Sequence, residues 1–89
     1  MREIVFDGAE LQYPQQIQDA LAERMEFPVW YGRNLDALHD CLGDICQETV
    51  IVLLNWEKDG YQAAVLRVMR DVAGENDYLC VIAEEKEEP

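Results

Sequence analysis

Three short runs rich in apolar and β-branched residues predict three β-strands. They lie at residues 2–6 (REIVF), 49–54 (TVIVLL) and 78–83 (YLCVIA). The first run ends at the Asp7-Gly8 pair, which is typical of a turn. The second and third runs are almost continuously apolar, a pattern that favours strands covered on both faces by other elements.

Apolar residues at helical spacing predict three helices between these strands. The first helix begins at Pro14, because proline suits the first turn of a helix. It is ended by Phe27-Pro28, since the residue before a proline disfavours helical backbone. Its apolar stripe consists of Ile17, Ala20, Leu21 and Met25.

The other two helices carry start and stop signals of their own. Asn34 is a good N-cap for a helix over residues 35–42, and Gly43 is its stop. The stretch DGYQ resembles a capping box in which Asp59 is the cap and Gln62 lies three positions on. The stripe of this third helix is Tyr61, Ala64, Val65, Val68, Met69 and Val72, and Gly74 closes it.

The resulting order of elements is β-α-α-β-α-β. Two helix-bridged connections between apolar strands imply parallel pairing, because parallel strands need a crossover. The sequence therefore predicts an α/β fold: a small three-stranded parallel sheet with helices packed on it. The 89 residues form one domain, 1–89, in which 84–89 (EEKEEP) is expected to be an acidic, solvated tail.

Composition narrows the partners of such a domain. Seven basic residues stand against nineteen acidic ones, giving a formal net charge of −12. A surface of this sign repels nucleic acid and speeds association with basic proteins. No apolar run approaches the roughly 18–20 residues of a membrane span, and the N-terminus lacks the pattern of a signal peptide. We therefore expect no nucleic-acid or membrane partner, and a cytoplasmic location.

The residue types available argue against catalysis and cofactor binding. The chain has one histidine and no serine, so no nucleophile and base pair is evident. Its three cysteines (Cys41, Cys46 and Cys80) have no framework spacing and are expected to be unpaired, mostly buried thiols. A metal site built from His39, Cys41 and Cys46 is disfavoured, because no standard zinc spacing appears. An acyl carrier protein needs a serine to attach its phosphopantetheine arm, and the chain has Ala37 where that serine would be. We expect no enzyme, no metal and no cofactor.

The helix over residues 35–42 carries two aspartates, Asp36 and Asp40, and no lysine or arginine follows them until Lys58. Its apolar arc contains Leu35, Leu38, Cys41 and Leu42, and the opposite arc contains Asp36, His39 and Asp40. Like charges four residues apart destabilise a helix by roughly 0.2–0.5 kcal/mol. The polar arc is either a merely solvated face of the helix or a binding face for a basic partner. Trp30 and Tyr31 just before it favour binding, since aromatic residues are enriched at interfaces.

The segment that contains these residues resembles the barstar family, small bacterial inhibitors of microbial ribonucleases. The matching positions are Tyr31-Gly32, Asn34-Leu35-Asp36-Ala37-Leu38 and Asp40-Cys41-Leu42. Over the rest of the chain the resemblance is weaker and rests on size, the order of elements and the final helix and strand. Several positions depart from the family pattern: Arg33 replaces an acidic residue, His39 replaces a tryptophan, Trp30 replaces the usual tyrosine, and the tryptophan that follows the second helix has no counterpart.

The resemblance implies a plug for a ribonuclease active site, in which carboxylates replace RNA phosphates. Asp40 would be the central anchor, Asp36 would contact the guanine-loop side of the cleft, and Asp71 would add a peripheral contact. Trp30 would cover the catalytic histidine. The other candidate contact or loop-shaping residues are Gly32, Asn34, Tyr31, His39 and Leu35.

The expected partner is a basic extracellular-type ribonuclease or ribonuclease toxin domain, bound one-to-one, so that the protein would act as an immunity protein for its producer. The alternative is a non-inhibitory acidic interaction module that binds another basic protein. A captured partner without nuclease activity would favour that alternative.

Overall fold

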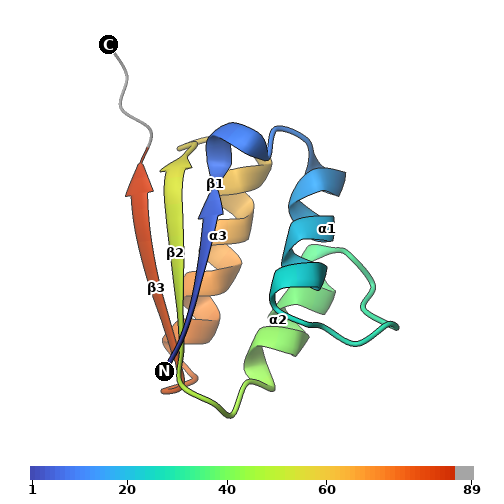
Figure 1. The fold of residues 1–89 in the computed structure, drawn as a ribbon, viewed down its shortest axis with the longest axis vertical. Helices are drawn as coiled ribbons and strands as arrows, with labels where there is room; N and C mark the ends of the chain where they lie inside the picture. The colour runs from blue at the N-terminus through green and yellow to red at the C-terminus, as the bar shows by residue number, and fades with distance from the viewer. Residues whose placement is uncertain (86–89) are drawn as a thin grey trace.

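The three predicted strands form one parallel sheet in the order β1-β2-β3, with β2 in the centre (Figure 1). The computed structural model describes residues 1–85. In chain order the elements are β1 (Arg2–Asp7), a 3-10 turn η1 (Gly8–Glu10), α1 (Pro14–Arg24), α2 (Leu35–Gly43), β2 (Thr49–Trp56), α3 (Gly60–Ala73) and β3 (Leu79–Glu85). The α/β fold and the β-α-α-β-α-β order are confirmed. Strand β3 includes residues 84 and 85 of the expected tail, and 86–89 lie outside the described residues.

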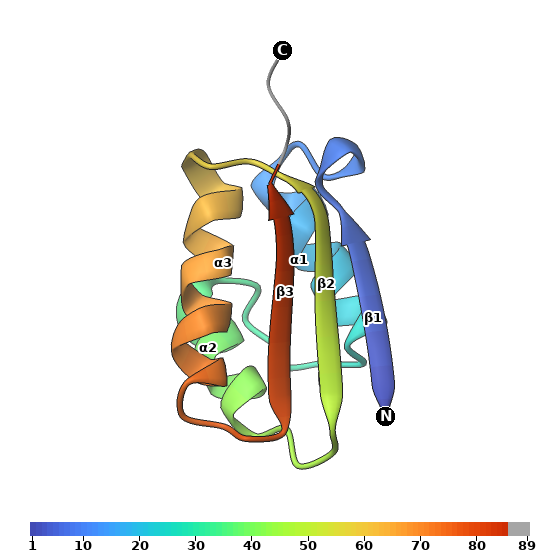
Figure 2. The same ribbon diagram turned by 90° about the vertical axis from the view of Figure 1, so that its left-hand side faces the viewer.

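All three α-helices lie on one face of the sheet, so the expected covering of both faces is wrong (Figure 2). Along β2, Thr49, Ile51 and Leu53 are buried, whereas Val50, Val52 and Leu54 alternate with them and are half-buried. On β3, Cys80 and Ile82 are exposed. The reason is topological. Because the strands follow one another across the sheet in chain order, two right-handed crossovers place every helix on the same side.

Helix α1 ends at Arg24, three residues before Phe27, and no glycine in the sequence marks this end. Glu26 adopts a left-handed backbone conformation with φ 57°. The Phe27 N–H bonds to the Ala22 carbonyl at 3.0 Å, and the Glu26 N–H bonds to the Glu23 carbonyl at 3.3 Å. This is a Schellman motif, which normally places glycine at the left-handed position. The chain has glutamate there, so no glycine marks the stop.

Gln62 does not complete a capping box, and that prediction is also wrong. Asp59 is the N-cap residue of α3, but its side chain makes no capping hydrogen bond. Gln62 is buried and bonds elsewhere: Nε2 donates to the Gly8 and Leu11 carbonyls at 2.9 and 2.8 Å, and Oε1 accepts from the Glu57 N–H at 2.7 Å. One side chain thus joins α3 to the turn after β1 and to the end of β2.

The three cysteines are free, as expected, but only Cys41 is buried. Cys46 and Cys80 are exposed. The prediction of mostly buried thiols is therefore wrong, because Cys80 lies on the uncovered face of the sheet despite its apolar neighbours in sequence.

Candidate functional site

Helix α2 presents one arc of polar side chains to solvent, as its pattern predicts. Its buried residues are Leu38, Cys41 and Leu42. Asp36, His39 and Asp40 lie on the opposite arc and are all exposed. The helix packs against α3, and Figure 2 shows it beside the C-terminal half of that helix. Asp71 is exposed on α3, close to its C-terminal end.

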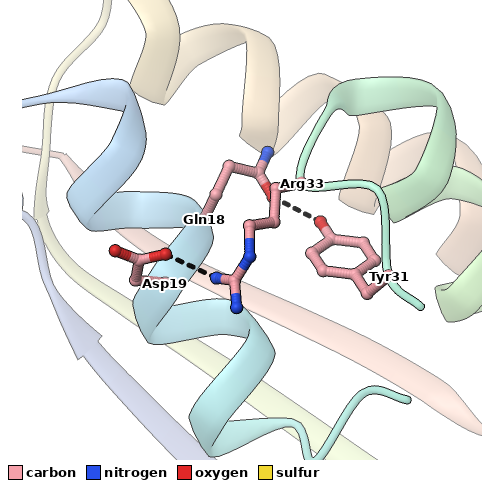
Figure 3. A network of polar contacts seen from close by, with 4 residues as sticks. All are labelled: Gln18, Asp19, Tyr31 and Arg33. Atoms are coloured by element: carbon pink, nitrogen blue, oxygen red, sulfur yellow. Dashed lines mark hydrogen bonds and ion pairs between the residues drawn. The ribbon is translucent and has the colours of Figure 1, made fainter. Parts of the chain in front are cut away.

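In the part of the chain that the structure describes, the carboxylates of Asp36 and Asp40 have no basic partner. Within residues 1–85 neither side chain has an ion pair or a hydrogen bond to another residue. Arg33 is the nearest basic residue in sequence, but its guanidinium pairs with Asp19 of α1 at 2.5 Å (Figure 3). The protein therefore holds its own arginine away from the acidic arc, and Asp36 and Asp40 keep their charge available.

A turn with an apolar tip lies in the loop that leads into α2. The Tyr31 N–H donates to the Pro28 carbonyl at 2.9 Å, which closes a four-residue turn with Val29 and Trp30 at its corners. The Val29 side chain is fully exposed and Trp30 is 73% exposed. Exposed large apolar residues next to unpaired charges are typical of protein-binding surfaces.

Tyr31 is buried beneath that tip and does not contribute exposed surface. It is 6% exposed, and its ring packs against Phe27 with centroids 4.7 Å apart. Its hydroxyl donates to Oε1 of Gln18 in α1 (Figure 3). Gln18 Nε2 in turn donates to the Tyr61 hydroxyl at 2.8 Å. Burial, with smaller contributions from Cys41 and Tyr61, raises the pKa of Tyr31, so the phenol stays protonated and remains a donor.

Asn34 joins the loop to the start of α2. Its Oδ1 accepts from the Ala37 N–H at 2.7 Å, and its Nδ2 lies 3.4 Å from the Gly32 carbonyl. A Cβ at Gly32 would lie 3.3 Å from Asn34 Nδ2 and 3.4 Å from the Ala37 Cβ, which is tight. Gly32 and Asn34 thus shape the corner that leads from Trp30 to Asp36, while Leu35 is half-buried at the helix start.

Replacing Asn34 by alanine should lower the free energy of unfolding by about 1 kcal/mol, the usual cost of losing an N-cap. Asn34→Asp retains the capping oxygen and suits the positive end of the helix dipole, so it should be close to neutral. Urea denaturation followed by circular dichroism measures both. Equal losses in the two variants would contradict the capping role of Oδ1.

Residues 1–87 match the family model described as Barstar (barnase inhibitor). The chain belongs to the barstar family. A Bacillus subtilis (strain 168) protein named "Putative ribonuclease inhibitor YrdF" is 43% identical over 58 residues. That alignment covers 64% of this chain and 64% of the relative, so part of each lies outside it.

In this barstar-family chain the one buried cysteine of the acidic helix is held as a thiol. Burial raises the pKa of Cys41, and the carboxylates of Asp44 and Asp40 raise it further. Within residues 1–85 no cluster of three or more His, Cys, Asp or Glu side chains could hold a metal ion. In the same part of the chain, no helix is long and apolar enough to cross a bilayer.

Sequence reasoning missed two residues that support this barstar-family loop, Gln18 and Asp19. A signal for Gln18 was present: it lies three and seven positions before Leu21 and Met25, on the buried side of α1. Nothing local indicates Asp19, because its partner Arg33 lies fourteen residues further along the chain.

Proposed function

We propose that the protein is an inhibitor of a microbial ribonuclease, and that α2 and the loop before it fill the enzyme's active site. The carboxylates of Asp40 and Asp36 occupy the places of RNA phosphates. Asp71 and His39 contribute at the edge, and Trp30 covers the catalytic centre. The inhibitor itself carries out no chemistry. It acts in the cytoplasm of its producer as an immunity protein, bound one-to-one to a basic ribonuclease of extracellular type or to a ribonuclease toxin domain.

One observation carries this proposal: two exposed carboxylates, without a partner in residues 1–85, share one face of α2, and an exposed tryptophan lies in the loop that leads into that helix. An active site that binds RNA must present arginines and lysines, whose desolvation needs an anionic partner. Carboxylates accept paired, charge-assisted hydrogen bonds from guanidinium groups. The small repulsion between Asp36 and Asp40, roughly 0.2–0.5 kcal/mol, is outweighed by such bonds. The family and the name of the relative support the same enzyme class.

The test is capture followed by an activity assay. The immobilised protein is used as bait for secreted and toxin-type proteins of its producer, and captured material is assayed for RNA cleavage with and without added inhibitor. We expect a basic ribonuclease that is silenced at one equivalent of inhibitor. A captured partner without nuclease activity would replace the proposal by a non-inhibitory interaction module.

Association should depend strongly on salt. The net charge of −12 and a basic partner imply electrostatic steering, which ions screen over a Debye length of about 10 Å at 0.1 M. Raising the ionic strength from about 0.05 to 0.5 M should therefore lower the association rate constant by at least roughly tenfold. The dissociation rate constant should change much less. Stopped-flow tryptophan fluorescence, to which the exposed Trp30 contributes, measures both rate constants, and an association rate constant insensitive to salt contradicts the steering.

A further inference from the structure

Three side chains, from α1, the loop before α2 and α3, are linked by hydrogen bonds, and two of them, Gln18 and Tyr31, are buried while Tyr61 is half-buried. Gln18 of α1, only 2% exposed, accepts a hydrogen bond from the Tyr31 hydroxyl and donates one to the Tyr61 hydroxyl of α3 at 2.8 Å. Both polar atoms of the Gln18 amide are therefore hydrogen-bonded: the oxygen to Tyr31 of the loop and the nitrogen to Tyr61 of α3. Figure 3 shows the Tyr31 hydroxyl directed at Gln18, while Arg33 reaches Asp19 one residue further along α1.

We propose that Gln18 is a positioning residue for the partner-binding loop: it fixes Tyr31, and through it the Val29-Trp30 tip, in the binding conformation before any partner arrives. This inference rests on the proposed function for its consequence in binding, but not for its effect on the loop. Gln18 itself contacts no partner.

The loop needs such an anchor because its own tip contributes nothing to the core. Val29 and Trp30 are exposed, and Tyr31 is the one fully buried side chain between Met25 and Leu38. Fixing the backbone of each loop residue in one conformation costs conformational entropy. A loop that is already ordered has met this cost during folding, so more of the contact energy appears as affinity.

The presence of glutamine at position 18 indicates that this side chain holds the loop through hydrogen bonds and does not merely fill space in the core. Gln18 lies on the buried side of α1 with Ile17 and Leu21, where a leucine would satisfy the packing. A buried amide is unfavourable unless it is hydrogen-bonded. Here its two partners come from elements that are remote in sequence, and such bonds specify one arrangement of the loop.

Hydrogen exchange tests the anchor without any partner. Gln18→Leu should speed exchange of the Tyr31 amide, which donates to the Pro28 carbonyl, by roughly tenfold, since the loss of both Gln18 hydrogen bonds loosens the turn. Amides of the central strand β2 should change by less than about threefold. Gln15→Leu makes the same chemical change at an exposed position of α1 and should leave both sets of amides unchanged.

Two milder variants keep the test valid if Gln18→Leu does not fold. Tyr31→Phe retains the ring contact with Phe27 and removes the donor to Gln18, so it should loosen the turn nearly as much. Tyr61→Phe leaves the bond between Tyr31 and Gln18 intact and should have a smaller effect. Unchanged exchange at Tyr31 in all three variants, or an equal rise throughout β2, overturns the positioning role.

The binding arm separates this inference from the proposed function. Against the captured ribonuclease, Gln18→Leu should weaken affinity about tenfold at a temperature where the variant is fully folded, with Gln15→Leu as the control. If no ribonuclease is captured but the turn loosens, the proposed function fails and the anchor stands. If inhibition is found and Gln18→Leu alters neither exchange nor affinity, the anchor fails and the function stands.

Discussion

Asp40→Ala should weaken binding to the target ribonuclease by about 2–5 kcal/mol, a range measured in part on the barnase–barstar complex itself. In affinity this is roughly 30- to 5,000-fold. Asp40 lies exposed in the middle of α2 with no ion pair within the described residues. Its removal would strand the arginines or lysines that it meets in the enzyme, and most of the loss comes from leaving those charges desolvated and unpaired.

Although Asp40→Ala should lower the affinity, it should leave the free energy of unfolding unchanged or raise it. Asp40 is four residues from both Asp36 and Asp44, so its removal relieves like-charge repulsion, and alanine is the better helix former. We expect a free energy of unfolding equal to that of the parent or up to about 0.5 kcal/mol higher. Isothermal titration calorimetry and urea denaturation measure the two quantities.

Glu3→Ala is the matched control for Asp40→Ala. Glu3 is exposed on β1, where it alternates with the buried Ile4, so it lies on the face of the sheet opposite the helices. The change removes the same charge from the chain but leaves α2 untouched. It should lower affinity by less than about threefold, through weaker steering alone. Equal losses in Glu3→Ala and Asp40→Ala would mean that net charge, and not the acidic arc, drives binding.

Gln62→Leu should lower the free energy of unfolding by about 3 kcal/mol. It would remove the partners of three backbone groups: the Gly8 and Leu11 carbonyls and the Glu57 N–H. Each buried group left unpaired costs about 1–3 kcal/mol, less where water can reach it, as it can near Glu57. Small domains have a stability of about 5–15 kcal/mol, so the variant would be marginal. Urea denaturation followed by circular dichroism measures the loss.

The acidic helix provides a second check on this variant. Gln62 lies at the opposite end of α3 from Asp71, so at low temperature the folded fraction of Gln62→Leu should still bind the ribonuclease with little change in affinity. Gln15→Leu again serves as the control for replacing an amide by an apolar side chain. A loss of stability no larger than that of Gln15→Leu would mean that water satisfies all three backbone groups.

Much of the fold could be predicted from the sequence because the relevant patterns are local. Strand-forming runs and helical spacing located every α-helix and β-strand within the described residues but not the 3-10 turn η1, and β2 and β3 extend two residues beyond their expected ends. Asn34 was identified as the cap of α2, and the arc of Asp36, His39 and Asp40 followed from the helical repeat. Their roles toward a partner stay a prediction, which the Asp40 experiment addresses.

The sequence by itself determined which residues form helices and strands and which face of α2 is polar, because hydrophobic spacing and capping act between residues close along the chain. Only the tertiary structure decided how polar side chains pair across the fold: Gln62 with Gly8 and Leu11, Gln18 with Tyr31 and Tyr61, and Arg33 with Asp19. It also decided that one sheet face stays uncovered and that Arg33 leaves the acidic arc unneutralised. Such pairings depend on the positions of elements far apart in sequence, which no local pattern records.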